Sequence, residues 1–121
     1  AGVLHLTKIA AAELAPYGIR VNAISPGLIV TNLMSHVLKA NPEQYEKLRP
    51  RIMDVAATVQ PVARAGAPDD IANAVFFLAS EDASFITGTN MVVDGGITVG
   101  ERRSWDPKTV GPLEHLKAMI E

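Results

Sequence analysis

The sequence predicts an α/β fold with a parallel sheet, and two adjacent patterns near its start carry this prediction. Residues 1–15 are mostly strong helix formers, and residues 19–24 form a short run rich in β-branched side chains. Pro16-Tyr17-Gly18 lies between them and ends the helix. A helix followed at once by a strand is the second half of a β-α-β unit, and such units build parallel sheets.

The first helix and its strand have distinct expected environments. Apolar residues wrap around more than one face of residues 1–15, which predicts a helix buried on two sides. Ala1 provides no capping side chain, so we expect the sequence to begin inside a helix. The strand over residues 19–24 is expected to end in a tight loop at Ser25-Pro26-Gly27.

Residues 28–67 form a long, loosely helical insertion of the kind that often serves as a lid. Asn41, Pro42 and Gln44 form a capping-box pattern that predicts the start of a helix. Pro50 and Pro61 are expected to interrupt any single long helix here. One apolar face precedes the capping box, made of Leu33, Met34, Val37 and Leu38.

A second helix-and-strand pair follows. Pro68, Asp69 and Asp70 occupy a first helical turn, where acidic side chains favour the positive end of the helix dipole. Apolar residues then recur at helical spacing, at Ile71, Ala74, Val75 and Leu78. Residues 90–94 predict a second buried strand, closed by two glycines. Residues 101–121 are expected to be a C-terminal extension that contains a helix and packs through one face. The residues of that face are Leu113, Leu116, Met119 and Ile120.

Composition excludes several classes of protein. The 121 residues include 11 Lys+Arg and 13 Asp+Glu, a net charge of −2 that argues against a nucleic-acid partner. With no cysteine, the chain has no disulfide and no thiol nucleophile. We expect no transmembrane helix and no signal peptide, and therefore a cytoplasmic protein without a membrane partner. The length fits one domain or part of a larger one.

Few side chains form a catalytic or metal-binding pattern. His5, His36 and His115 are far apart in sequence and lack ligand spacing, so we expect no metal site. Tyr17 and Tyr45 have no lysine three or four residues away, one helical turn along the same face, to lower the pKa of a phenol. Neither tyrosine is therefore a good candidate for an acid.

Residues 26–31 are the strongest candidate for a binding site. They follow the carboxyl end of a predicted parallel strand, where open α/β sheets place their ligands. Gly27 allows close approach to the backbone, and the Thr31 hydroxyl with exposed peptide groups could bind an amide. Pro-Gly is also common in ordinary turns, so from spacing alone both interpretations stand.

Several segments resemble the short-chain dehydrogenase/reductase family. They occur in the family's order and cover residues 1 to about 100. The matching segments are Ala1-Gly2-Val3, Leu6-Thr7-Lys8, residues 13–27, residues 66–72, Phe77-Leu78-Ala79-Ser80, Thr87-Gly88 and residues 92–96. The resemblance implies the C-terminal half of a doubly wound parallel-sheet (Rossmann) domain, with residues 32–60 as the substrate loop and 101–121 as an extension.

The resemblance also implies an oxidoreductase that uses NAD or NADP to move a hydride to or from a small alcohol or carbonyl substrate. It assigns nicotinamide binding to Pro26, Gly27, Leu28, Ile29 and Thr31, with backbone groups near Ile29 and the Thr31 hydroxyl holding the carboxamide. Substrate-loop side chains would line an apolar pocket or simply pack in the core, namely Leu33, Met34, Val37, Leu38 and Met53. The full-length form is expected to be a homodimer or homotetramer.

The family's catalytic residues have no counterpart in the chain. Its Gly-rich phosphate loop, catalytic Ser and Tyr-x-x-x-Lys motif are missing, and the motif would fall upstream of Ala1. We therefore expect the chain to be part of a dehydrogenase and to be inactive on its own. The alternative is a non-catalytic module that docks on full-length subunits, and a half of another α/β nucleotide-binding domain is a third interpretation.

Overall fold

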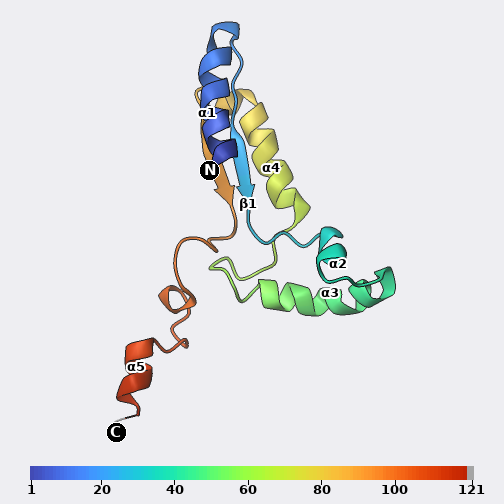
Figure 1. Ribbon diagram of the computed structural model, residues 1–121, viewed down its shortest axis with the longest axis vertical. Helices are drawn as coiled ribbons and strands as arrows, with labels where there is room; N and C mark the ends of the chain where they lie inside the picture. Colours follow the sequence, from blue (N-terminus) through green and yellow to red (C-terminus); the bar gives the residue numbers. More distant parts are fainter. Residues whose placement is uncertain (120–121) are drawn as a thin grey trace.

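The computed structural model describes residues 1–119, and a two-stranded parallel sheet lies beside two of its helices (Figure 1). β1 (Ala23–Pro26) pairs with β2 (Asn90–Val93), with Ala23 opposite Asn90 and Pro26 opposite Val93. α4 (Pro68–Ala79) packs against both strands. α1 (Gly2–Leu14) continues into a 3₁₀ turn, Ala15–Tyr17, before the chain enters β1. The α/β class and the parallel sheet predicted from the sequence are thus confirmed.

β1 begins and ends later than predicted. The expected strand covered residues 19–24, but Val21 and Asn22 bond irregularly to residues 86–89 instead of forming a ladder. The Asn22 side chain donates to the Ile86 carbonyl at 3.0 Å and accepts from the Thr89 N–H at 3.1 Å. Ser25 and Pro26 belong to the strand and not to the turn. Proline is tolerated there because β1 is paired along one edge only in the two-stranded sheet.

α1 has the predicted position but not the predicted burial. Within residues 1–119 only Thr7 and Ala11 of this helix are buried, and Val3 is 72% exposed. β2 was likewise predicted to be buried, yet Val92 is 52% exposed. Neither burial is present within the described chain, because its two strands and α4 leave one side of α1 and of β2 uncovered.

α2 (Leu33–Val37) and α3 (Pro42–Ala56) form a helical hairpin. The predicted capping box is present: the Gln44 N–H donates to the Asn41 side chain, and the Asn41 N–H donates to the Gln44 side chain, both at 2.9 Å. Pro50 was expected to interrupt a helix, and this was wrong because α3 continues through it. A proline removes a single intrahelical donor, and the capping box stabilises the first turn. Pro61 lies beyond the end of α3.

The start of α4 follows the sequence prediction. The Asp70 carboxylate accepts from the Ala67 N–H at 2.8 Å and receives the Arg64 guanidinium at 2.6 and 2.7 Å. Capping, as expected from its place in the first turn, is therefore the role of Asp70. Of the predicted apolar stripe, Leu78 is buried and Val75 is exposed.

We expect the Arg64–Asp70 pair to make stability depend on pH. Mainly through its hydrogen bond, the Arg64 guanidinium lowers the pKa of Asp70 from 3.8 to about 2. A carboxyl whose pKa is lower in the folded state stabilises above its unfolded pKa, and this is lost as the pH falls through the folded value. As the pH is lowered from 3.8 to about 2, the urea midpoint should therefore fall less for Asp70→Asn than for the wild type. Asp69→Asn is the control, because Asp69 makes no side-chain hydrogen bond within residues 1–119; an equal change in both variants would contradict the prediction.

The C-terminal segment leads away from the sheet (Figure 1). It contains a 3₁₀ turn at Arg102–Ser104 and α5 (Pro112–Lys117). Leu113, Leu116 and Met119 were expected to pack one face, but all three are exposed. Ile120, the fourth member of that stripe, lies outside the described residues. Along residues 1–119, no helix combines the length and apolar character needed to cross a membrane.

Candidate functional site

The carboxyl ends of β1 and β2 meet at Gly27 and Asp94. The Gly27 N–H donates to the Val93 carbonyl at 3.0 Å. A Cβ added at Gly27 would lie 2.5 Å from the Asp94 Cα, which leaves no room for any other residue. The glycine thus lets the two chain segments touch at the edge where parallel sheets bind ligands.

Beyond Gly27 the chain runs beside Gly66. Ile29 forms a parallel bridge with Gly66, and the Val30 N–H donates to the Gly66 carbonyl at 2.9 Å. A Cβ on Gly66 would lie 2.6 Å from the Ile29 Cδ1 atom. Val30 is buried, so this short segment is fixed from one side.

Ile29 and Thr31 provide the polar groups of this segment. Within residues 1–119, neither the N–H nor the C=O of Ile29 has a hydrogen-bond partner. The Thr31 hydroxyl accepts from the Leu33 N–H at 3.3 Å, so its own hydrogen is available for donation. The Thr31 carbonyl accepts from the Met34 N–H at 3.0 Å and from the Tyr45 hydroxyl at 2.7 Å.

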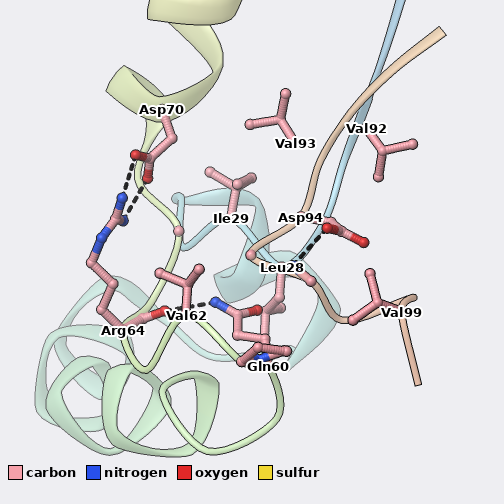
Figure 2. A pocket seen from close by; sticks show the side chains of 14 residues that line it. Leu28, Ile29, Gln60, Val62, Arg64, Asp70, Val92, Val93, Asp94 and Val99 are labelled. Carbon is pink, nitrogen blue, oxygen red and sulfur yellow. Dashed lines mark hydrogen bonds and ion pairs between the residues drawn. The ribbon is translucent and has the colours of Figure 1, made fainter. Parts of the chain in front are cut away.

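Two hollows border the segment, and Ile29 lines both. The first, of about 690 Å³, is open and apolar, and Pro26 and Thr31 line it together with α4 side chains such as Val75. The second, of about 420 Å³, includes Leu28 (Figure 2). The five residues predicted to bind nicotinamide are therefore adjacent, but Pro26 and Thr31 face one hollow and Leu28 the other.

The Gln60 Nε2 atom and the Asp94 carboxylate bond to the walls of the second hollow, whereas the Gln60 Oε1 atom is buried without a hydrogen-bond partner within residues 1–119. Gln60 is 3% exposed and its Nε2 donates to the Arg64 carbonyl at 2.6 Å (Figure 2). The Asp94 carboxylate accepts from the Thr98 hydroxyl at 2.7 Å and from the Gly96 N–H at 2.7 Å. These bonds, the one from Thr98 first, lower the pKa of Asp94. The Asp94 carboxylate therefore stabilises the loop that follows β2.

The substrate-loop residues predicted from the sequence lie apart from these hollows. Neither hollow is lined by any of them. Most are exposed on the α2–α3 hairpin, namely Leu33, Val37, Leu38 and Met53, while Met34 is half-buried. Their contact with a substrate stays a prediction. Sequence reasoning considered Tyr45 only as an acid and missed Gln60, although both are among the most buried side chains near the segment.

The arrangement fits one chemical group well. A primary amide has two N–H donors and a carbonyl acceptor, and Ile29 offers a free C=O and N–H beside the Thr31 hydroxyl. No group of three His, Cys, Asp or Glu side chains that could hold a metal occurs in the part of the chain that the structure describes. The site is thus suited to binding an amide through uncharged groups.

Comparison with known proteins agrees with this architecture. A family model described as enoyl-(acyl carrier protein) reductase matches residues 1–98. A short-chain dehydrogenase of Penicillium roqueforti is 41% identical over 97 residues, covering 80% of this chain and 32% of the relative. The L-rhamnose 1-dehydrogenase (NAD(P)(+)) of Azotobacter vinelandii is 40% identical over 99 residues, covering 82% and 35%.

Solved structures give the same result. The structure of 4-hydroxyisoleucine dehydrogenase complexed with NADH is 38% identical, with a TM-score of 0.64, over 83% of this chain and 37% of that chain. The fold is thus part of a Rossmann domain. The chain belongs to the short-chain dehydrogenase/reductase family. It spans about a third of the length of the curated relatives it matches.

Proposed function

We propose that residues 1–100 are the C-terminal half of an NAD(P)-binding domain in an oxidoreductase. The reaction is the transfer of a hydride between nicotinamide and the carbon of an alcohol or carbonyl substrate. Family membership supports this proposal, as do relatives whose names include NADH or NAD(P)(+). The nicotinamide would supply the hydride, and this chain would bind and orient it.

The observation that carries the proposal is the pair of unpartnered peptide groups on Ile29 beside the Thr31 hydroxyl. Ile29 and Thr31 would hold the carboxamide of NAD or NADP, while Pro26, Gly27 and Leu28 set the path of the backbone. Fixing this amide restricts how the ring can lie relative to the substrate, because the carboxamide is attached directly to the ring. We assign no catalytic residue to this chain.

The other assignments extend this proposal to the complete protein. Residues 32–60 would form the substrate loop, and residues 101–121 an extension outside the matched family region. The exposed apolar side of α1 supports assembly into a homodimer or homotetramer, where a second subunit would cover it. The proposed location is the cytoplasm.

We expect the complete protein that contains this chain to bind NADH or NADPH. Thr31→Val should raise the Kd about fivefold, which is the effect of losing one neutral hydrogen bond. Nicotinamide fluorescence titration would measure the Kd. Thr58→Val is the matched control, because within residues 1–119 the Thr58 hydroxyl bonds only to the Val55 carbonyl of its own segment.

Two outcomes would contradict the proposal. One is a folded complete protein that binds neither NADH nor NADPH. The other is a reading frame and native mass that correspond to this chain alone, together with stable association with full-length subunits. The second outcome would favour the non-catalytic docking module.

A further inference from the structure

The α2–α3 hairpin closes back on the residue from which it starts. Thr31 lies two residues before α2, and Tyr45 lies in the first turn of α3. The Tyr45 hydroxyl donates to the Thr31 carbonyl at 2.7 Å, across 14 residues of sequence. Residues 31–45 are therefore a ring closed by one side-chain hydrogen bond.

Local hydrogen bonds fix the far end of this ring. Lys39 has a φ of 51°, and the Ala40 N–H donates to the Ser35 carbonyl at 2.9 Å, which ends α2 in a left-handed turn. The reciprocal bonds between Asn41 and Gln44 start α3 two residues later. The helix that carries Tyr45 thus has a defined direction relative to α2.

Tyr45 is only 3% exposed, whereas the other tyrosine, Tyr17, is 76% exposed. A buried tyrosine hydroxyl requires a hydrogen-bond partner, and the Thr31 carbonyl is the partner here. The proton of the phenol is engaged in this bond. Tyr45 is therefore suited to hold a neighbour in place and not to exchange protons with a substrate.

Thr31 receives bonds on both of its oxygen atoms. Its carbonyl accepts from Tyr45 and Met34, and its hydroxyl oxygen accepts from the Leu33 N–H. These bonds fix the residue and leave the hydroxyl hydrogen to donate outward. Removing the bond from Tyr45 would free the hairpin from Thr31 and loosen the orientation of its hydroxyl.

We propose that Tyr45 is a positioning residue that fastens the α2–α3 hairpin to Thr31, so that the same hydrogen bond orients the Thr31 hydroxyl and places the side chains of α2. The proposal rests on the proposed role of Thr31 in nicotinamide binding. The hydrogen bond from Tyr45 to Thr31 would couple cofactor binding to the contacts that α2 makes. A substrate that rests on α2 would therefore change the affinity for NAD(P), and the cofactor would change the affinity for the substrate by the same factor.

The test is the Kd for NADH or NADPH of the complete protein with Tyr45→Phe. We expect the Kd to rise about three- to tenfold, the effect of one buried hydrogen bond. Tyr17→Phe is the matched control and should leave the Kd unchanged, because Tyr17 is exposed on the 3₁₀ turn after α1. An unchanged Kd in folded Tyr45→Phe would overturn the inference.

A double-variant cycle separates positioning from a general loss of structure. If Tyr45 acts through the Thr31 hydroxyl, Tyr45→Phe should change the Kd less than about twofold in a Thr31→Val background. If the Kd of the double variant rises by the full product of the two single-variant fold-changes, the inference is overturned. If Tyr45→Phe does not fold, Asn41→Ala decides: it loosens the ring at its far end, so a raised Kd supports the inference and an unchanged Kd overturns it. A wild-type protein that binds neither cofactor would instead contradict the proposed function.

Discussion

Gly27→Ala is expected to destabilise the protein by about 3 kcal/mol, the upper part of the range for overpacking a filled interior. The added methyl would lie 2.5 Å from the Cα and 2.6 Å from the Cβ of Asp94. Both atoms belong to the chain leaving β2, so no flexible side chain can move aside. Relief requires the carboxyl ends of β1 and β2 to separate, which breaks the bond from the Gly27 N–H to Val93.

Urea unfolding followed by circular dichroism would measure this effect. Gly2→Ala is the matched control, because a Cβ at Gly2 meets nothing within 4 Å and the residue is the first in α1. We expect the control to change stability by less than about 1 kcal/mol. Equal midpoints for Gly27→Ala and the wild type would show that this contact does not constrain the sheet.

The elements predicted most closely from the sequence are those fixed by nearby residues. The starts of α3 and α4 were correct because Asn41 with Gln44, and Asp70 with Ala67, satisfy helix N–H groups within three positions. Such bonds depend on spacing alone. The sequence shows spacing directly.

The boundaries of β1 and the burial of α1 depend on distant surfaces. Val21 and Asn22 have strand-like composition, but their partners are residues 86–89, which periodicity does not reveal. An apolar helix such as α1 indicates that something covers it, and the described chain leaves one side of it open. Composition predicts the need for burial but not the surface that provides it.

The candidate site shows the same division. The segment from Pro26 to Thr31 was predicted from its place after a strand, and the structure places it at the sheet edge. Tyr45 was considered only as an acid and rejected, because its role requires the Thr31 carbonyl, 14 residues away. A hydrogen bond between a side chain and a distant peptide group has no spacing signature.

Arg20→Ala is expected to cost about 3 kcal/mol, as removal of a charged donor from several carbonyls does. The Arg20 guanidinium donates to the carbonyls of Leu78 at 2.8 Å, of Ser80 at 3.2 Å and of Ile86 at 3.2 Å. Leu78 and Ser80 lie at the C-terminal end of α4, where carbonyls lack partners within the helix and a positive charge is favourable. The Arg20 side chain thus connects the residues just before β1 with the C-terminal end of α4 and with the segment that precedes β2.

Geometry makes this role specific to arginine. The Nη1 and Nη2 atoms reach three carbonyls from a planar fork, and a lysine ammonium has no second arm. We therefore expect Arg20→Lys to recover less than half of the lost stability. Arg51→Ala is the matched control, since Arg51 is exposed on α3, and its urea midpoint should equal that of the wild type. Full rescue by lysine would show that charge at the end of α4, and not the joining of three carbonyls, is what Arg20 provides.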